Sequence, residues 1–495
     1  MNSVPEIRIL KANRANVNLS GDYILYWMTA FRRINWNYSL DRAVYWSEQL
    51  NKPLVIFEAL RCGYDWASDR LHRFILDGMA DNARQLKKKN CLYYPYVETH
   101  PDSDKGLLET LGKKACLVVT DDYPAFFLPR MTASASKKLP VLLEQVDSNG
   151  LLPMRLTDRV FPTAYSFRRF LQKNLPSHLL DHPSAAPLKH LKIKRLPSLP
   201  NEIMKRWPPA SSVLLRGDAK ELHTLPIDHS VTVIDERGGS LQARHILRRF
   251  LDDRLGHYVE DRNHPDMEGT SNLSPSLHFG HISPHEIFHR IAEKESWLPG
   301  ELDENSRGNK SGWWGMGASS EAFLDQLITW RELGFNMCLN RKDYDQYESL
   351  PDWAKKTLKE HELDERDYIY EIETLEEAGT HDPLWNAAQR QLLREGRLHN
   401  YLRMLWGKKI LEWSVSPREA LRKMIRLNNR YALDGRDPNS YSGIFWVLGR
   451  YDRAWGPKRS VFGKIRYMSS NNTLKKVRVK EYMKRYHTQN SYIFK

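Results

Sequence analysis

Residues 380–413, THDPLWNAAQRQLLREGRLHNYLRMLWGKKILEW, contain the clearest structural signals in the chain. Asp382 followed by Pro383 predicts a helix start, because aspartate caps a first turn and proline is tolerated at its first position. Helical periodicity then runs to Gly396, and a second helical stretch after it carries Trp406 and Trp413. The connection at Gly396 is short. The sequence therefore predicts two helices that pack against each other.

The same helix-start chemistry recurs elsewhere in the second half. Ser283-Pro284-His285-Glu286 and Ser416-Pro417-Arg418-Glu419 each combine a serine cap, a proline at the first helical position and a glutamate at the third. From Gly239 onward nearly every segment has helical periodicity. We predict that this half is all-helical.

The first third alternates strand-like and helix-like runs. The β-rich runs are Tyr23–Met28, Pro53–Ala59, Cys116–Thr120 and Pro140–Gln145, and the helical stretches include Asp41–Leu50 and Ser68–Lys88. Strands separated by helices of this length predict βαβ units. We expect an α/β N-terminal domain with a parallel, Rossmann-like sheet. No glycine-rich nucleotide-binding pattern follows any of these strands.

The expected domain boundaries follow from this change of pattern. Residues 181–235 are rich in Pro, His and Lys with few periodic runs, which is typical of a connection between domains. We therefore expect an α/β domain at 1–180, a linker at 181–235 and an all-α domain at 236–495.

Composition excludes several protein classes. The 495 residues are 41% hydrophobic and 27% charged, as in ordinary globular proteins, and no apolar run approaches the roughly 18 residues that a membrane span requires. The N-terminus shows no secretion signal, so a cytoplasmic location is expected, associated with the nucleoid in a bacterium. The four cysteines, Cys62, Cys91, Cys116 and Cys338, match neither a disulfide framework nor a metal-site spacing, and no metal is expected.

Positive charge is concentrated at one end of the chain. Residues 321–380 hold 7 basic and 16 acidic residues, whereas residues 381–495 hold 25 and 8, a local excess of 25 − 8 = 17. Such one-ended basicity indicates a polyanionic partner, most often nucleic acid. A solvated basic surface explains the same counts, so charge alone leaves both interpretations open.

Several side chains form candidate sites. Trp406 and Trp413 are seven residues apart on one predicted helix, with Trp385 on the preceding one, an arrangement that suits either an electron relay or ordinary helix packing. Gln326 and Trp330 share a helix face, where the amide could hydrogen-bond the edge of a base and the indole could stack on it.

Two polar stretches are further candidates. The hydroxyl-rich turn GTSNLSP at 269–275 opens a helix, where unpaired N–H groups suit a phosphate, although helix caps without a ligand are commoner. Residues 428–446, NNRYALDGRDPNSYSGIFW, could bond a flat polar ligand or form an ordinary structured loop. No serine-hydrolase or zinc-protease motif is present.

Longer strings carry a specific resemblance. TSNLSPSLHFGHISP (270–284), THDPLWNAAQRQLL (380–393), LRMLWGKKILEW (402–413), LDGRDPNSYSGIFW (433–446) and VFGKIRYMSS (461–470) resemble the class II cyclobutane pyrimidine dimer photolyases, a branch of the photolyase/cryptochrome superfamily. The similarity runs from about Tyr23 to about Tyr486 and is looser in the N-terminal half.

The resemblance implies an antenna domain at the N-terminus and a helical domain that holds FAD without a covalent bond. The implied enzyme is a deoxyribodipyrimidine photo-lyase, a carbon–carbon lyase. In it, light excites the reduced flavin, an electron passes to a pyrimidine dimer flipped out of DNA, the dimer splits and the electron returns.

The resemblance also assigns residues by position. Cofactor-binding positions are Thr270, Ser271, Leu273, Ser274, Arg403, Asp434 and Asp437, together with Asn428, which resembles the asparagine facing flavin N5. Trp406, Trp385 and Trp413 resemble the proximal, middle and distal members of the photoreduction chain. Trp330, Met404 and Trp446 resemble the lesion pocket, and Arg453 and Arg466 resemble DNA contacts.

Two positions depart from the family pattern. Gln326 stands where a glutamate is usual, and Leu405 where a tyrosine is usual. Glutamine can bond the edge of a dimer, but it has neither a charge nor a proton to share. A cryptochrome-like blue-light photoreceptor, or a photolyase for another photoproduct, therefore remains an alternative to dimer repair.

The resemblance implies DNA containing pyrimidine dimers as the substrate, no membrane association and a monomeric protein. An antenna chromophore of deazaflavin or folate type is compatible with the family, and the sequence does not identify which.

Overall fold

The computed structural model describes residues 4–487. These residues divide into two compact units. The first unit comprises residues 4–158, 173–248 and 272–300, and the second comprises residues 159–172, 249–271 and 301–487. The segment 181–235, expected to connect two domains, belongs to the first unit, where Trp207, Leu214 and Leu222 are buried. Its apolar residues occur singly among Pro, His and Lys, so no periodicity reveals them.

The first unit is built on one six-stranded sheet. Its strands are β1 (Ile9–Lys11), β2 (Tyr23–Met28), β3 (Leu54–Leu60), β4 (Leu92–Val97), β5 (Ala115–Asp121) and β6 (Leu143–Val146), in the order β1-β6-β5-β2-β3-β4. All neighbouring pairs are parallel except β1 with β6. The expected α/β architecture is thus confirmed, with one antiparallel edge strand in place of a wholly parallel sheet.

Both edge strands escape the sequence analysis, for different reasons. β1 is only three residues long and half exposed, so it has no apolar run to detect. β4 contains Pro95, which normally argues against a strand. Proline is tolerated here because β4 lies at the sheet edge, where a missing N–H donor costs no ladder bond.

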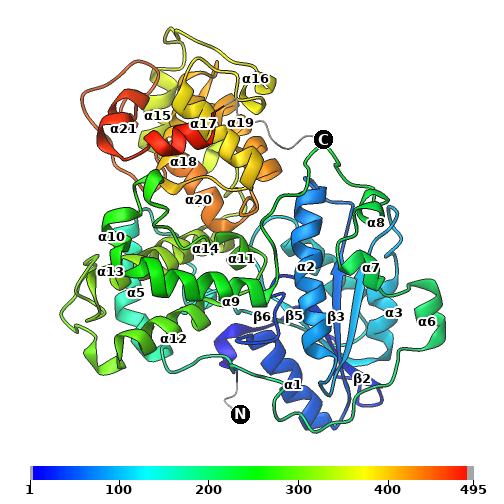
Figure 1. Ribbon diagram of the computed structural model, residues 1–495. Coiled ribbons are helices and arrows are strands. Elements are labelled where there is room, and N and C mark those ends of the chain that lie inside the picture. The colour runs from blue at the N-terminus through cyan, green and yellow to red at the C-terminus, as the bar shows by residue number, and fades with distance from the viewer. Residues whose placement is uncertain (1–3, 488–495) are drawn as a thin grey trace. The chain divides into compact units, whose positions relative to one another are not determined.

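Helices cover both faces of this sheet (Figure 1). Alternate residues of β2 divide between two cores: Ile24 packs with residues of α1, and Leu25 packs with residues of α3 and α4. The helices assigned to this unit are α1 (Tyr38–Leu50), α2 (Asp69–Leu86), α3 (Leu107–Lys114), α4 (Leu128–Lys138), α6 (Asn201–Arg206), α7 (Ser212–Leu215), α8 (Ala219–His223), α9 (Ser240–Arg249), α11 (Ser274–His278) and α12 (Pro284–Glu295).

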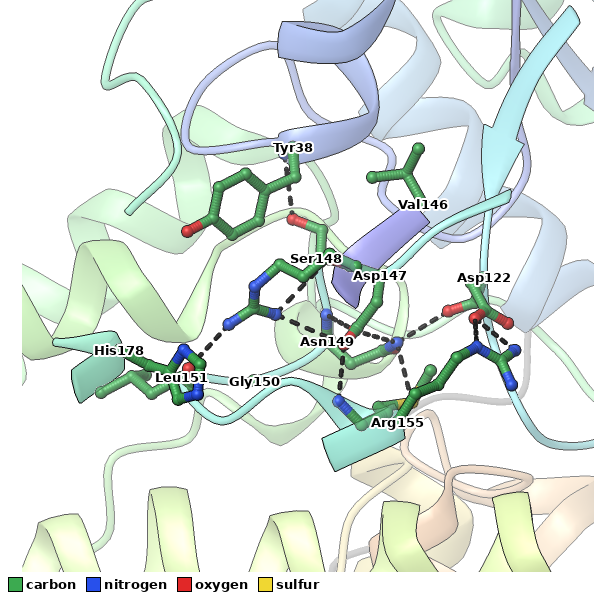
Figure 2. A network of polar contacts seen from close by, with 12 residues as sticks. Tyr38, Asp122, Val146, Asp147, Ser148, Asn149, Gly150, Leu151, Arg155 and His178 are labelled. Carbon is green, nitrogen blue, oxygen red and sulfur yellow. Dashed lines mark hydrogen bonds and ion pairs between the residues drawn. The ribbon is translucent and has the colours of Figure 1, made fainter. Parts of the chain in front are cut away.

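Polar side chains at the carboxyl edge of this sheet form hydrogen bonds and ion pairs with other residues of the same unit. Asp121 accepts hydrogen bonds from the backbone N–H groups of residues 29–31 at 2.7–2.9 Å. Figure 2 shows the neighbouring network after β5 and β6, in which Asp122 pairs with Arg155 at 2.6 Å. Asp147 also forms an ion pair, with Arg8 at 3.3 Å. These contacts hold the loops at the edge where open α/β sheets commonly bind ligands.

The second unit is helical, as predicted. No β-strand occurs between Gly239 and His487, the last described residue. Its helices are α5 (Ala164–Asn174), α10 (Tyr258–Asp261), α13 (Ala318–Leu324), α14 (Arg331–Asn340), α15 (Asp352–Glu360), α16 (Ile372–Glu376), α17 (Pro383–Glu395), α18 (Asn400–Glu412), α19 (Pro417–Tyr431), α20 (Pro438–Val447), α21 (Ser470–Lys476) and α22 (Lys480–Arg485). The unit also contains two π-helical turns, η4 (Phe250–Arg254) and η8 (Asp325–Trp330).

The predicted caps account for where these helices begin. The Asp382 side chain accepts from the backbone N–H groups of Leu384 and Trp385, which fixes the start of α17. Ser416 accepts from the N–H of Glu419 at the start of α19. Gly396 ends α17 in the left-handed conformation (φ 63°), which glycine adopts without strain. The short connection then brings α18 against α17.

Candidate functional site

Three buried tryptophans lie in contact where α17 meets α18. The ring centroids of Trp385 and Trp406 are 6.5 Å apart and their planes differ by 1°. Trp413, one residue past α18, lies 5.6 Å from Trp385 with the planes at 70°. Trp385 therefore touches both others, as the middle member of a relay must. The part of these residues in electron transfer stays a prediction.

Uncharged acceptors bind the N–H groups of the two inner indoles. Trp406 Nε1 donates to Gln389 Oε1 at 2.9 Å, and Trp385 Nε1 donates to the carbonyl oxygen of Trp406 at 3.0 Å. Gln389 is not among the residues predicted from the sequence. Its spacing of four residues from Trp385 on α17 is the signal that could have revealed it. Both rings are thus held in place by hydrogen bonds to uncharged acceptors.

A polar network joins α18 to α19 and to the loop that follows. Arg403 Nη2 lies 2.9 and 3.1 Å from the two carboxylate oxygens of Asp434, and its Nη1 donates to Asn428 Oδ1 at 3.4 Å. Asn428 Nδ2 donates to Ser440 Oγ at 2.8 Å. The structure therefore brings together three of the residues predicted to surround a cofactor, and adds Ser440, which the sequence analysis missed.

The loop between α19 and α20 is held by a buried arginine. Arg436, at φ 68°, donates to the carbonyl oxygens of Asn429, Ala432 and Leu433. Asp437 accepts from the N–H of Asn439 at 2.8 Å and caps α20. The carboxylate of Asp437 thus has a structural role, and its proposed contact with a cofactor stays a prediction.

The hydroxyl-rich turn is divided between the two units. Thr270 and Ser271 belong to the second unit, where the Thr270 carbonyl oxygen accepts from Arg254 Nη1 at 3.0 Å. Leu273 and Ser274 belong to the first unit, where Ser274 begins α11. The phosphate contacts expected of these four residues stay predictions.

Gln326 and Trp330 lie on the π-helical turn η8, which joins α13 to α14. Both side chains are partly exposed. Among the described residues, the Gln326 amide makes no hydrogen bond to the protein, so its donors and acceptor are available to a ligand. π-Helical turns are frequent at functional sites, because the extra residue redirects the side chains around it. No sequence pattern signals this local geometry.

The other two predicted pocket residues, Met404 and Trp446, lie on the packed helices α18 and α20. α14 and α18 both pack against α20. A Cβ added at Gly334 of α14 would lie 2.8 Å from the Pro438 carbonyl oxygen, so glycine permits this close approach. Met404 of α18 reaches within 3.8 Å of the position of a Cβ on Gly443 of α20. Trp446 is on the same helix and is partly exposed.

Arginine and tryptophan side chains alternate in a row that begins at Trp446, near the end of α20, and continues in the segment after it. Arg466 lies 5.6 Å from the Trp446 ring and 5.1 Å from the Trp455 ring, and Arg453 lies 4.7 Å from the Trp455 ring. All four side chains are at least partly exposed. Exposed cations interleaved with aromatic rings suit a nucleic acid, since cations meet phosphates and indoles stack on bases. Trp455 is the member of this row that the sequence analysis missed.

Buried polar atoms beside α18 fit a flat polar cofactor such as FAD. His399 lies one turn before Arg403, and both of its ring nitrogens are buried without a partner among the described residues. Burial lowers the pKa of His399 to about 4, so the ring is neutral and offers one donor and one acceptor. Gln389 Nε2 is likewise buried and unpartnered within residues 4–487. A ligand rich in ring nitrogens and carbonyls would satisfy these atoms.

Neither a metal-binding cluster nor a membrane-spanning helix is found in the described part of the chain. Within residues 4–487, no group of three or more His, Cys, Asp or Glu side chains could hold a metal ion. No helix in the same range is long and apolar enough to cross a membrane.

Known proteins with sequences similar to this chain share one name. No family model matches the chain. The chain is 33% identical over 479 residues to the deoxyribodipyrimidine photo-lyase of Methanothermobacter thermautotrophicus, covering 97% of each. It is 31% identical to the enzymes of the same name from Potorous tridactylus, covering 92% of this chain and 80% of that one, and from Arabidopsis thaliana, covering 93% and 88%.

A solved structure agrees with the fold. A bacterial class III photolyase from Agrobacterium tumefaciens superposes with a TM-score of 0.67 at 16% identity, covering 95% of this chain and 87% of that chain. At this identity the likeness concerns the fold alone.

Proposed function

The chain belongs to the deoxyribodipyrimidine photo-lyase family, and we propose that it is a class II member that splits cyclobutane pyrimidine dimers in DNA with FAD as its cofactor. Light-driven DNA repair is the activity of this family, and FAD is the cofactor that its members use. For this chain we propose, in addition, membership of class II, the cyclobutane dimer as the lesion, and the roles of the residues named below.

One observation supports the proposal most strongly. Within four residues, α18 contributes a side chain to each of three neighbouring clusters. Arg403 pairs with Asp434, Met404 lies against α20, and Trp406 stacks parallel to Trp385. A single helix thus links the expected cofactor contacts, lesion pocket and relay, so the three would operate at short range.

The polar network would hold the cofactor. FAD, when bound, supplies a light-excited electron donor, a chemistry that amino-acid side chains lack. The Arg403–Asp434 pair is mostly buried, with about 14% and 13% of the side chains exposed, so its charge is only weakly screened. Asn428, held by Arg403 and Ser440, would present a fixed amide to the flavin ring.

The tryptophan cluster would return the cofactor to its reduced state. Trp406 would donate an electron toward the cofactor, and Trp385 and Trp413 would refill it in turn. Contact between successive rings supports this order. The acceptors on the inner N–H groups are an amide and a carbonyl, neither of which is basic enough to remove a proton from an oxidised indole.

The half-exposed side chains of η8, α18 and α20 would receive the lesion. Trp330 and Trp446 would stack on the flipped bases, and the unbonded Gln326 amide would reach their polar edge. Arg453 and Arg466 would contact the phosphates around the lesion.

Illumination of a defined substrate tests the proposal. The purified protein, reduced beforehand, is mixed with an oligonucleotide that contains a single thymine dimer and is kept under blue light or in the dark. We expect loss of the dimer under light only. Light-independent loss, or no loss from a protein that binds reduced FAD, would contradict the proposal.

Gln326 is the specific observation that favours a second candidate, repair of a different photoproduct. A carboxylic acid at this position would bond more strongly as negative charge develops on a cyclobutane dimer, an effect of up to a few kcal/mol in a dry pocket. Gln326→Glu should therefore raise the yield of thymine-dimer splitting per absorbed photon. If the yield falls while splitting of another photoproduct is lost as well, glutamine is adapted to that other lesion.

A further inference from the structure

Lys408 is a fully buried lysine beside the expected lesion pocket. None of its surface is exposed to solvent. Its Nζ donates to the carbonyl oxygen of Val447 at 2.6 Å and lies 5.2 Å from the centre of the Trp446 ring. Among the described residues, no carboxylate forms an ion pair with it. Buried lysines are normally paired, so an unpaired one requires an explanation.

The packing of α18 against α20 brings the lysine to this position. A Cβ added at Gly407 would lie 2.5 Å from a methyl group of Val447, so only glycine permits this approach. Met404, one turn before Lys408, lies over Gly443. The face of α18 that meets α20 therefore bears a predicted pocket residue and, next to it, the lysine.

The acceptor is suited to a cation. Val447 is the last residue of α20, and the carbonyl groups at the C-terminal end of a helix carry partial negative charge. The Trp446 ring adds the negative potential of its face, which attracts an ammonium group. Together these two groups replace the missing carboxylate and fix the ammonium group against the indole.

Other charges nearby act in opposite directions. Burial is the main cause that lowers the pKa of Lys408, to about 7; Asp452 raises it and Arg466 lowers it further. Both of these groups lie on the segment after α20, and no titratable group of α17 or α19 has a comparable effect on Lys408. The lysine can therefore gain or lose its charge near neutral pH.

We infer that Lys408 is a positioning residue of the lesion pocket, whose ammonium group holds the Trp446 ring in place for stacking on a damaged base. This inference rests on the proposed function. A damaged base stacks on the Trp446 ring that the ammonium group holds, so binding of damaged DNA favours the charged form of Lys408 over the neutral one. Recognition of damage would thus be coupled to proton uptake by Lys408 at pH values above its pKa in the free protein.

The sign of the pH effect follows from this coupling. A group whose pKa rises on binding strengthens binding fully below its pKa in the free protein, and this gain declines as pH increases above that value. Discrimination, the Kd for undamaged duplex divided by the Kd for damaged duplex, should be highest at pH 6. It should be lower by about tenfold at pH 9, an effect within the range of a desolvated cation–π contact.

Three variants test the inference. Lys408→Met removes the charge and keeps an unbranched apolar chain, whereas Lys408→Arg keeps a charge that does not titrate in this range. Lys423→Met is the matched control, because Lys423 is also buried and donates to a carbonyl oxygen, that of Tyr370 at 2.7 Å, but pairs with Glu419. FAD content and a thermal melt verify that each variant is folded.

Binding of damaged and undamaged duplexes is then measured from pH 6 to pH 9. We expect discrimination by Lys408→Met to be low and independent of pH, near the wild-type value at pH 9, and Lys423→Met to follow the wild type. A folded Lys408→Met protein with the wild-type pH profile would overturn the inference while leaving the proposed function intact. Should Lys408→Met not fold, a Lys408→Arg profile that still falls with pH would overturn it.

Failure of the proposed function is distinguishable within the same experiment. A wild-type protein with no preference for damaged duplex at any pH would contradict the lesion pocket itself, and the role of Lys408 with it. A wild type that prefers damaged duplex equally at all pH values would overturn only the proton coupling and the positioning role inferred from it.

Discussion

Two groups of tryptophans in the second unit differ in what surrounds their rings. Trp385 and Trp406 are buried, stack on each other and donate to uncharged acceptors. Trp446 and Trp455 are half exposed and lie beside Lys408, Arg453 and Arg466. A nearby positive charge makes a ring harder to oxidise, because the product would be a second cation. The two inner rings therefore suit electron transfer, and the second group suits binding. Trp413, the outer member of the proposed relay, differs from the inner rings, because Lys409 Nζ lies 5.5 Å from the centre of its ring.

The largest effect should come from the first group. Trp406→Phe should abolish photoreduction of oxidised FAD and leave FAD bound, because phenylalanine keeps the packing and is far harder to oxidise. Absorption spectra recorded during illumination measure this. Trp207→Phe, a buried tryptophan of the first unit, is the control. Photoreduction at the wild-type rate in Trp406→Phe would remove this residue from the relay.

Cofactor binding should respond next most strongly. Arg403→Ala removes a cation from the expected cofactor site and leaves Asp434 without its partner, so FAD affinity should fall by roughly tenfold to a hundredfold, the loss of one charge-assisted contact of about 1.5–3 kcal/mol. Titration of the apoprotein with FAD measures it. Arg426→Ala, which breaks a more exposed pair with Glu376, should leave FAD affinity unchanged. Equal losses in both variants would indicate general destabilisation.

Removal of a ring from the second group should have a smaller effect, confined to damaged DNA. Trp446→Ala should weaken binding of a dimer-containing duplex about tenfold, since stacking on one base contributes about 1–3 kcal/mol. Undamaged duplex, measured in parallel, should bind as before. Photoreduction of FAD should also be normal, which separates this group from the relay. A parallel loss of affinity for both duplexes would assign Trp446 to general DNA binding.

The smallest effect should come from the arginines. Replacing Arg453 and Arg466 with alanine should flatten the slope of log K against log salt by about 0.9 for each phosphate that the protein no longer neutralises. The change should be the same for damaged and undamaged duplexes, because phosphates carry no lesion. Lys137→Ala, an exposed lysine of the first unit, should leave the slope unchanged. An unaltered slope in the double variant would exclude both arginines as DNA contacts.

The sequence predicted the local features of this site and missed the long-range ones. The starts of α17 and α19 followed from Asp382 and Ser416, because a cap acts on residues two or three positions away. The hydrogen bond from Trp406 to Gln389 and that from Lys408 to Val447 join residues 17 and 39 positions apart. No periodicity encodes such pairs, since helix packing creates them.

The family resemblance located residues whose neighbours local patterns could not identify. Arg403, Asn428 and Asp434 have no common spacing, yet the structure places them in one network. The π-helical turn at Gln326 had no signal, because an extra residue in a helical turn leaves the apolar pattern almost unchanged. Edge strand β4 was missed because a proline inside a strand is acceptable only at an edge.

Dimer splitting by protein reduced beforehand tests the central claim most directly. The wild type, Trp406→Phe and Trp446→Ala are each illuminated with a limiting amount of one thymine-dimer oligonucleotide, and dimer loss per absorbed photon is measured. We predict equal splitting by the wild type and Trp406→Phe, since a reduced cofactor needs no relay, and a clear loss in Trp446→Ala. No light-dependent loss by the wild type, or an equal loss in both variants, would contradict the account.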